Sequence, residues 1–348
     1  MKKKLLSVLM AAVMVAGVGG VGAAQVKADD EKILGAGIYS ASDNFNSYIG
    51  KAITNACDGI FKTNIEDGQN DQSTQNNQVD TMLAKGASAV AVSVCDVTAA
   101  PTLIQKCKDA GNVPIIFFNK EITDYDVINS YENAYQVTST GGDYGASIQA
   151  QMVIDYWKEH PEMDKNGDGK LQLVYLMGDP GHTASQPRCD YLKSTIEDAG
   201  IEIDLLAEDT GMWVTATAKE KMDAWVSKYG DEIECCVAGN DAMALGALSA
   251  VEAAGFNTDG EESSKYIPIY GIDALPEILS KIESGEITGS VLQDAKTQGQ
   301  TIVKMAENLT SGKDAVDGIE GVEVEEEAKA VRAVSYTHLR AHETLANL

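Results

Sequence analysis

A segment of alternating oxygen-bearing residues, DKNGDGKLQ, occupies positions 164–172. The oxygens that it offers at every second position belong to Asp164, Asn166, Asp168, the backbone carbonyl of Lys170, and Gln172. This spacing, with a glycine at the sixth position, matches the first nine residues of a calcium-binding EF-hand loop. The glutamate expected at the twelfth position is absent, because Tyr175 stands there in an apolar run. The segment therefore predicts a structural Ca²⁺ site that needs one more ligand, the alternative being a polar turn without an ion.

A second group of polar and aromatic residues follows successive apolar runs of the chain. In an open α/β sheet, ligands bind beyond the carboxyl ends of the strands, so residues at these positions converge. The group comprises Asp43, Phe45, Asn119, His182, Arg188, Trp213, Asn240, Asp273 and Gln293. Carboxylates, amides and arginine suit sugar hydroxyls, which both donate and accept hydrogen bonds, and aromatic rings suit the C–H faces of a sugar. The group predicts a monosaccharide site.

Each member of this group also has a purely structural interpretation. Asp43 and Asn240 precede helical segments and could simply cap them. Phe45 and Trp213 could belong to the hydrophobic core, the histidine could be a turn residue, and the arginine could be a solvated helix residue. The functional interpretation rests on the position of all of them at the same end of successive strands.

The elements that must position these side chains alternate between strand and helix. The first half predicts strands over 33–39, 61–65, 89–94 and 114–118, with helices over 44–57, 71–84 and 101–110. The alternation restarts with strands over 171–177, 201–207, 233–238, 267–271 and 287–292, and helices over 144–158, 188–198, 215–228, 241–254, 276–284 and 297–309. So many βαβ units exceed one sheet, and we expect an α/β fold of two similar doubly wound parallel-sheet lobes.

The net charge of the chain limits its possible partners, and its first residues indicate where the protein is located. The chain has 348 residues and a net charge of −26, which argues against a nucleic-acid partner because phosphate binding needs clustered lysine and arginine. Three lysines at positions 2–4, an apolar run over 5–21 and small residues near Ala28 predict a signal peptide over residues 1–28. An uncleaved membrane anchor is the alternative. We expect export to the periplasm or the extracellular face of the cell envelope.

The six cysteines and the last residues need separate interpretation. The cysteines show no metal-binding spacing, and buried free thiols are favoured, although a disulfide is an alternative. Cys235 and Cys236 are adjacent in an apolar run and should point to opposite faces of one strand.

Residues 333–348 contain VSYTHLRAHET, which is similar to the translation of a sequencing adapter, so His338 and His342 are assigned no function.

The strand-end residues belong to motifs that resemble the periplasmic galactose/glucose-binding proteins of sugar ABC transport. In chain order the motifs are DNF at 43–45, QNDQS at 69–73, FFNKE at 117–121, PGH at 180–182, MW at 212–213, KMDAW at 221–225, NDAMALGA at 240–247 and GIDALPE at 271–277. The resemblance runs from about Ile33 to Arg332. It implies a type I periplasmic binding protein fold whose lobes, joined by a three-segment hinge, close on the sugar.

The resemblance also implies domains and residue roles. It implies an N-terminal sugar-binding lobe of residues 29–138 plus 293–332 and a C-terminal lobe of residues 139–292 with the calcium loop. The matching sugar hydrogen bonders are Asp43, Asn119, His182, Arg188, Asn240 and Asp273, and the stacking rings are Phe45 and Trp213. Two positions depart: a family aspartate is Ala184 here, and a family asparagine is Gln293. The family's remote calcium ligand matches Glu234.

The patterns and the resemblance together predict a non-catalytic monomer that binds glucose or galactose. The resemblance implies that it delivers the sugar to an ABC permease complex. An enzyme that uses paired carboxylates on a glycosidic bond is a rival, but no nucleophile motif and no phosphate-binding glycine loop accompanies them. A sugar-responsive transcription regulator would need a helix-turn-helix and a basic face. The main alternative is a sugar sensor that presents its closed form to a chemoreceptor or sensor kinase.

Overall fold

A computed structural model describes residues 32–138, 142–261, 263–333 and 338–340. The predicted signal peptide and most of the adapter-like tail lie outside these residues. Among the described helices, none has the length and apolar character needed to cross a bilayer.

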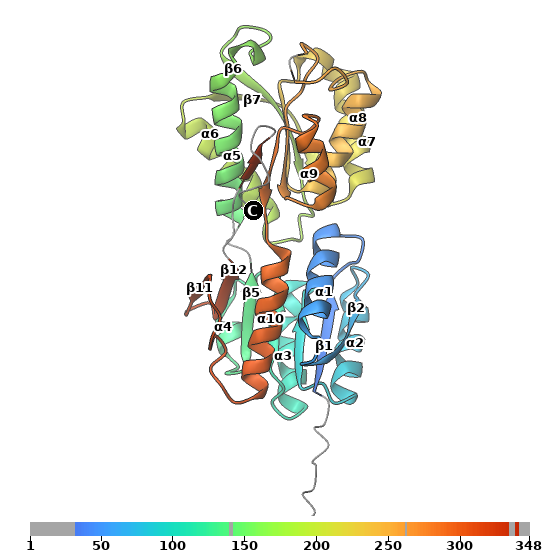
Figure 1. Cartoon of the computed structure of the whole chain (residues 1–348), viewed down its shortest axis with the longest axis vertical. Helices are drawn as coiled ribbons and strands as arrows, with labels where there is room; N and C mark the ends of the chain where they lie inside the picture. The colour runs from blue at the N-terminus through green and yellow to red at the C-terminus, as the bar shows by residue number, and fades with distance from the viewer. Residues whose placement is uncertain (1–31, 139–141, 262, 334–337, 341–348) are drawn as a thin grey trace, which may run out of the picture. The chain divides into compact units, whose positions relative to one another are not determined.

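The first lobe is built on a mixed sheet in the order β11-β12-β5-β4-β3-β1-β2 (Figure 1). Its parallel strands are β1 (Ile33–Ile38), β2 (Lys62–Asp67), β3 (Ala89–Val92), β4 (Ile115–Phe118), β5 (Ala134–Thr138) and β12 (Ala330–Ala333). Strand β11 (Val322–Glu325) adds an antiparallel edge. The helices are α1 (Asn44–Ala56), α2 (Gln72–Ala84), α3 (Ala100–Asp109), α4 (Tyr125–Asn129) and α10 (Ala295–Thr310).

The central strands of this lobe are apolar on both faces, so helices must cover both. Residues of α1 and α10 pack with one face of the sheet, and residues of α2 and α3 pack with the other. The approach of α10 to α1 is close because a side chain at Gly299 would lie 2.5 Å from the Cβ atom of Ala52.

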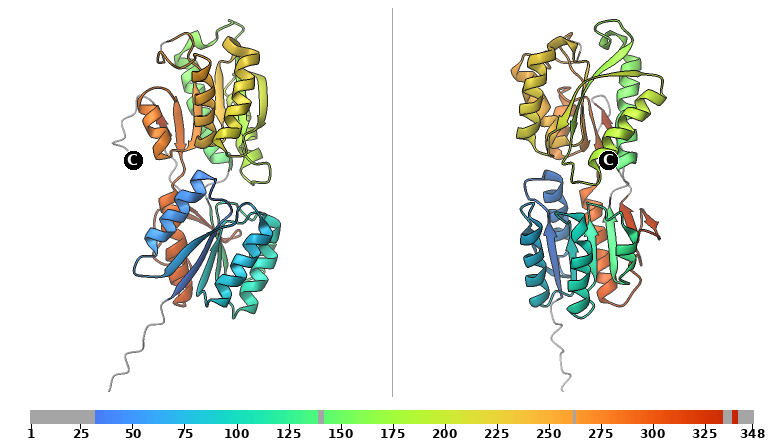
Figure 2. Two further views of the ribbon diagram at one scale, coloured as in Figure 1. Left: turned by 90° about the vertical axis from the view of Figure 1, so that its right-hand side faces the viewer. Right: turned by 180° about the vertical axis from the view of Figure 1, so that it is seen from behind.

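The second lobe repeats this construction of a sheet covered by helices (Figure 2). Its strand order is β13-β10-β9-β8-β6-β7. Its parallel strands are β6 (Lys170–Met177), β7 (Glu202–Thr210), β8 (Cys235–Ala238), β9 (Ile269–Asp273) and β10 (Gly289–Leu292), with β13 (His338–Arg340) antiparallel to β10. The helices are α5 (Gly142–Glu159), α6 (Ser185–Asp198), α7 (Thr215–Tyr229), α8 (Asp241–Ala253) and α9 (Pro276–Glu283).

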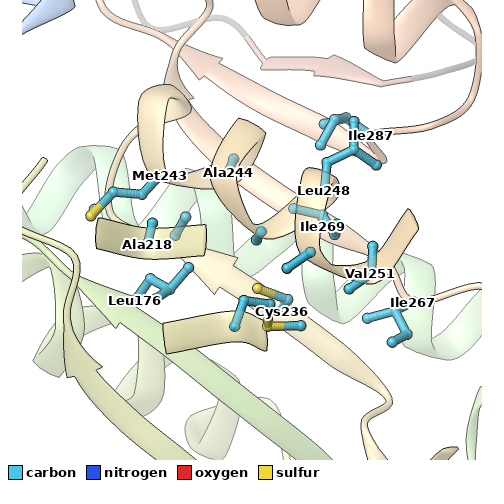
Figure 3. Packing of buried hydrophobic residues seen from close by; sticks show 14 of the residues in the cluster. Leu176, Ala218, Cys236, Met243, Ala244, Leu248, Val251, Ile267, Ile269 and Ile287 are labelled. Atoms are coloured by element: carbon cyan, nitrogen blue, oxygen red, sulfur yellow. The ribbon is translucent and has the colours of Figure 1, made fainter. Parts of the chain in front are cut away.

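The core of the second lobe is divided by its sheet into two clusters. Figure 3 shows the cluster beneath α7 and α8, which contains Leu176, Cys236 and Met243. Cys235 belongs to the cluster on the other face, under α5 and α6. The expectation that the paired cysteines point to opposite faces is therefore confirmed, and the six cysteines are free thiols, with only Cys95 partly exposed.

The two lobes share one strand order, β2-β1-β3-β4-β5 in the first and β7-β6-β8-β9-β10 in the second. This repetition confirms the predicted fold of two similar doubly wound lobes. Helix α4 and strands β5, β11 and β12 were not predicted from the sequence, since no element was expected between Phe118 and Tyr144 or after residue 309. Strand β7 continues to Thr210, past the predicted end at Ala207, through acidic residues that the apolar pattern excluded.

Candidate functional site

The nine strand-end residues predicted to bind a sugar line one cavity. Its free volume is about 20 Å³, and its lining consists of Asp43, Phe45, Asn119, His182, Arg188, Trp213, Asn240, Asp273 and Gln293. We call it the sugar cavity. The volume is that of about one water molecule, so a ligand must displace lining groups as it enters. An adjoining pocket of about 140 Å³ shares Asp43 and Trp213 with it.

The lining residues stand where strands end and helices begin. Asn119 follows β4, Trp213 lies between β7 and α7, and Asp273 ends β9. All three have positive φ angles, of 65°, 62° and 130° respectively. Such backbone conformations are costly for residues other than glycine and persist where the surrounding structure holds them, often at ligand sites.

Trp213 forms one wall of the cavity and depends on two glycines. A Cβ atom at Gly178 would lie 2.0 Å from the indole ring, and one at Gly239 would lie 3.2 Å from it. The indole ring therefore packs directly against the backbone of Gly178 and Gly239, where there is no room for a side chain. The His182 ring meets it edge-on at a centroid distance of 5.3 Å, and the Arg188 guanidinium lies 5.5 Å from its centroid. The side chain is only 5% exposed, and its Nε1 donor has no partner.

Arg188 is held at the cavity by hydrogen bonds to two other segments of the chain. Its Nη1 donates to the carbonyl of Gly239 at 2.6 Å, and its Nη2 donates to Oε1 of Gln293 at 2.6 Å. Its Nε has no partner. Gln293 is one of the two departures from the family pattern, and its amide oxygen holds the guanidinium in place.

Asp43 and Asn240 both cap helices and line the cavity, so their structural and functional interpretations are compatible. Asp43 Oδ1 accepts from the backbone N–H of Asn46 at 2.8 Å, and Tyr39 donates its hydroxyl to Oδ2. Asn240 Oδ1 accepts from Met243 N at 3.0 Å. In each case the cap at the start of α1 or α8 fixes the side chain at the cavity.

Burial controls the ionisation of the cavity. It raises the pKa of Asp43, and it raises the pKa of Asp273 well above its ordinary value, with the neighbouring Asp241 carboxylate adding to the effect. It also lowers the pKa of His182, as do Lys120 and Arg188 nearby. His182 is therefore neutral at physiological pH. Its Nδ1 accepts from Ala184 N at 3.1 Å, which leaves the proton on Nε2.

The 164–172 loop is held by its own oxygens. Asp164 accepts from the N–H groups of Asp168 and Gly169 at 3.1 and 3.0 Å, and Asp168 accepts from Lys170 N at 2.8 Å. Glu234, the remote residue, is brought to the loop and accepts from Lys165 N at 2.7 Å and Gln172 N at 3.1 Å. Burial raises the pKa of Glu234, and the nearby Asp164 carboxylate adds to the rise.

The loop passes one test of fit to a calcium ion. Gln172 Oε1 is buried without a partner, as a ligand oxygen would be before the ion binds. Within the described residues, no three Asp, Glu, His or Cys side chains are grouped closely enough to hold a metal by themselves. An ion would therefore also need amide and carbonyl oxygens, which are those that the spacing offers at Asn166, Lys170 and Gln172 and which suit a hard cation.

Two residues that support the sugar cavity, Tyr39 and Gly178, were not predicted from the sequence. Tyr39 hydrogen-bonds Asp43, and the centroid of its ring lies 4.2 Å from the ammonium of Lys120, which the strand-end rule does include beside Asn119. Gly178 makes room for Trp213. Tyr39 ends the predicted strand over 33–39 and could have been found by the strand-end rule. Nothing local in the sequence identifies Gly178.

Comparisons with known proteins agree with this architecture. A family model described as a periplasmic binding protein domain matches residues 36–314. The D-galactose/methyl-galactoside binding periplasmic protein MglB of Haemophilus influenzae is 42% identical over 82% of this chain and 83% of its own. A putative rhizopine-binding protein of Rhizobium meliloti is 29% identical over 77% and 82%. The solved structure of a Bacillus halodurans ABC transporter solute binding protein with bound myo-inositol has a TM-score of 0.72 and 26% identity, covering 89% of this chain and 95% of that one.

Proposed function

This chain belongs to the periplasmic binding protein family, and we propose that it is an exported receptor that binds one hexose of the galactose or glucose type for an ABC importer. The galactoside-binding relative, 42% identical over 82% of this chain, supports the choice of sugar. The names of the relatives describe binding proteins, which supports a role without turnover.

The observation that carries the proposal is a set of buried polar atoms without partners around the sugar cavity. Arg188 Nε, Trp213 Nε1 and Asp273 Oδ2 are all buried and unpaired. A buried donor or acceptor without a partner costs about 1–3 kcal/mol. Two N–H donors and one carboxyl group, all on residues that line one cavity, match a ligand that both donates and accepts, as each sugar hydroxyl does.

The aromatic residues add shape to this chemistry. Phe45 and Trp213 line the same cavity from different lobes, and each is about 95% buried. Their faces suit the two C–H faces of a pyranose ring, and the polar groups around them suit its rim. A ligand held from both lobes favours the conformation in which both sets of contacts form, by as much as its affinity for the two states differs. The permease would then recognise that conformation.

We propose further that the 164–172 loop and Glu234 hold a structural Ca²⁺. The supporting observations are the oxygen spacing, the orphaned Gln172 Oε1 and the proximity of Asp164 to Glu234. When bound, the ion would neutralise the three carboxylates of Asp164, Asp168 and Glu234 and so fix the loop to the start of β8, which Glu234 directly precedes. It lies outside the set of residues that line the sugar cavity.

Calorimetric titration of the full chain with glucose, galactose, ribose and xylose in calcium buffer tests the main proposal. We expect glucose or galactose to bind with a Kd of about 1 µM or tighter, corresponding to roughly 8 kcal/mol. A folded sample that bound none of the four sugars would contradict the proposal. A sensory role with a chemoreceptor as partner, and a monomeric state, stay predictions.

A further inference from the structure

Three hydrogen-bond donors of the second lobe lie together in the lining of the sugar cavity, on His182, Arg188 and Trp213. The centroid of the Trp213 ring is 5.3 Å from that of the His182 ring and 5.5 Å from the Arg188 guanidinium. Arg188 Nε and Trp213 Nε1 are buried without a partner. Because Nδ1 of His182 accepts from Ala184 N, its Nε2 carries the proton and is the third donor.

Two buried cations beside these donors are bonded to neutral oxygens. Arg188, 6% exposed, donates to the carbonyl oxygens of Gly239 and Gln293, both at 2.6 Å. Lys120, 1% exposed, donates to a backbone carbonyl at 2.8 Å. Among the described residues, no carboxylate forms a salt bridge with either side chain. Besides burial, both cations lower the pKa of His182, which places them near the same ring. A buried charge without an ion-pair partner is costly, so an anion that entered here would be stabilised.

The carboxyl groups that line the cavity are engaged elsewhere or favour their neutral form. Asp43 accepts from the N–H of Asn46 and from the hydroxyl of Tyr39. Burial, and then the neighbouring Asp241 carboxylate, raise the pKa of Asp273 well above its ordinary value, which favours the protonated form of Asp273. A protonated carboxyl group carries no charge and can donate a hydrogen bond.

The start of helix α6 also favours an anion. Its N-cap residue, Ala184, forms no side-chain cap hydrogen bond, and its first turn contains no acidic residue. The carbonyl of Ala184 accepts from Arg188 N at 3.0 Å, so residue 184 stands one helical turn before the guanidinium. A helix N-terminus carries a partial positive charge, and here no side chain of the helix itself offsets it.

We propose that the sugar cavity prefers an acidic sugar, a hexuronate, whose C6 carboxylate accepts hydrogen bonds from His182, Arg188 and Trp213. The inference rests on the proposed function of this cavity and names its substrate class more closely. A hexuronate keeps the ring and the ring hydroxyls of a hexose and replaces the CH₂OH group by a carboxylate of similar size. Carboxylate oxygens only accept, whereas the side chains of arginine and tryptophan only donate. Bonds between a guanidinium and a carboxylate are stronger than those to a neutral hydroxyl.

Calorimetric titration of the full chain with galactose, galacturonate, glucose and glucuronate, near neutral pH in calcium buffer, tests the preference. We expect one uronate to bind at least about tenfold more tightly than the matching hexose. Hexose binding without tighter uronate binding would overturn the inference and leave the proposed function standing. Failure of all four sugars to bind a folded sample would contradict the proposed function itself.

The variant Gln293→Glu tests whether charge sets the preference. It places a carboxylate where an amide oxygen now accepts from Arg188 Nη2 and so supplies from the protein the charge that the ligand would bring. Glutamate and glutamine have nearly the same shape, so the parent is the matched control. We expect the ratio of uronate to hexose affinity to fall by about tenfold or more. An unchanged ratio would overturn the inference.

A second pair of variants gives an independent readout at the start of α6. Ala184→Asp adds a charge one turn before Arg188, and Ala184→Asn adds a side chain of the same size without the charge. Both can cap the helix, so neither should lower the melting temperature. We expect the ratio of uronate to hexose affinity to fall by about threefold or more in Ala184→Asp and to stay near that of the parent in Ala184→Asn. Equal changes in both variants would mean that size and not charge sets the ratio, and the inference would be wrong.

Discussion

The sugar cavity and the 164–172 loop are both polar sites, but they are built in opposite ways. The cavity collects residues from position 43 to position 293 and buries them. The loop uses residues close together in the sequence, which are exposed or half-buried apart from Leu171 and Gln172, plus the buried Glu234. In the loop, the oxygens of Asp164 and Glu234 already accept backbone N–H groups. In the cavity, three buried polar atoms have no partner, whereas in the loop one has none, Gln172 Oε1.

This difference separates what the chain does alone from what it needs a ligand to complete. A loop whose carboxylates are satisfied by its own backbone keeps its conformation through local bonds, and an ion adds to it. A cavity with orphaned donors carries an energetic cost until something bonds them. We therefore expect ligand effects on affinity to be dominated by the cavity and ion effects to be local to the loop.

The largest expected effect is that of Trp213→Ala on sugar affinity. The ring is 5% exposed, lies on bare backbone and carries an unpaired Nε1, and buried aromatic anchors often contribute about 2 kcal/mol or more. We expect at least a 30-fold rise in the Kd for the preferred sugar, measured by calorimetry. Trp225→Ala, in α7 and packed against the same core, is the control and should cost stability and not affinity. Unchanged sugar binding in Trp213→Ala would remove this residue from the site.

Sequence reasoning reached the members of both sites but by different routes. The calcium ligands that we propose for the loop follow from spacing alone, because the oxygen-bearing residues recur along the chain at intervals of two. The cavity could be predicted only through the rule that parallel strands end at one edge, which brought Asp43, Asn119 and Asp273 together before any geometry was known. Glu234 came from family resemblance, since nothing near the loop points to a residue so far along the chain.

The supporting contacts were harder to predict. Gly178 matters because of what a side chain there would strike, which depends on the position of the Trp213 ring across a strand connection. Strand β5 was missed because its sequence, AYQVT, is short and mixes polar with apolar residues. A second cavity, of about 620 Å³, is lined by residues of both lobes, among them Ala184 and Arg332, so no local sequence pattern could indicate it.

Glu234→Gln should weaken calcium binding at the 164–172 loop and leave sugar binding in the cavity unchanged. Glutamine keeps the size and one acceptor oxygen of Glu234 but removes a charge, and calcium affinity depends on the number of charged ligands. We expect calcium affinity to fall by about tenfold or more and the calcium-dependent rise in melting temperature to shrink accordingly. Sugar affinity in saturating calcium should be unchanged. The exposed neighbour Glu232 provides the control variant Glu232→Gln, and an equal loss of calcium binding there would show a merely electrostatic effect.

Gly178→Ala tests whether the cavity depends on the exact seat of the indole ring. The added Cβ would lie 2.0 Å from the Trp213 ring and must displace it. Overpacking of this kind costs roughly 1–3 kcal/mol, so we expect sugar affinity to fall by about fivefold to tenfold while calcium affinity is unchanged. Gly181→Ala is the control, because Gly181 is exposed and the nearest atom to its added Cβ is the end of a side chain, 3.3 Å away. Similar losses of sugar affinity in Gly178→Ala and Gly181→Ala would contradict a dependence of the cavity on the position of the indole ring.

The smallest expected effect concerns pH, where the two sites should differ in sign. Burial raises the pKa of Asp241, which accepts from Leu275 N at 2.8 Å and from the Ser290 hydroxyl at 2.6 Å beside the cavity. Backbone hydrogen bonding lowers the pKa of Asp168 in the loop.

A raised folded-state pKa means that the native state holds a proton that the unfolded state has released. The stability contributed by Asp241 is therefore present below its ordinary pKa near 4 and is lost as the pH rises toward neutrality. The contribution of Asp168 is present above that ordinary value and is lost only as the pH falls below it. Between about pH 5 and pH 8, the free energy of unfolding measured in urea should therefore fall less with rising pH for Asp241→Asn than for the parent, by about 1 kcal/mol. For Asp168→Asn it should change in parallel with that of the parent. Parallel curves for all three proteins would mean that the buried carboxylate is ionised across this range, and the electrostatic contrast between cavity and loop would then be wrong.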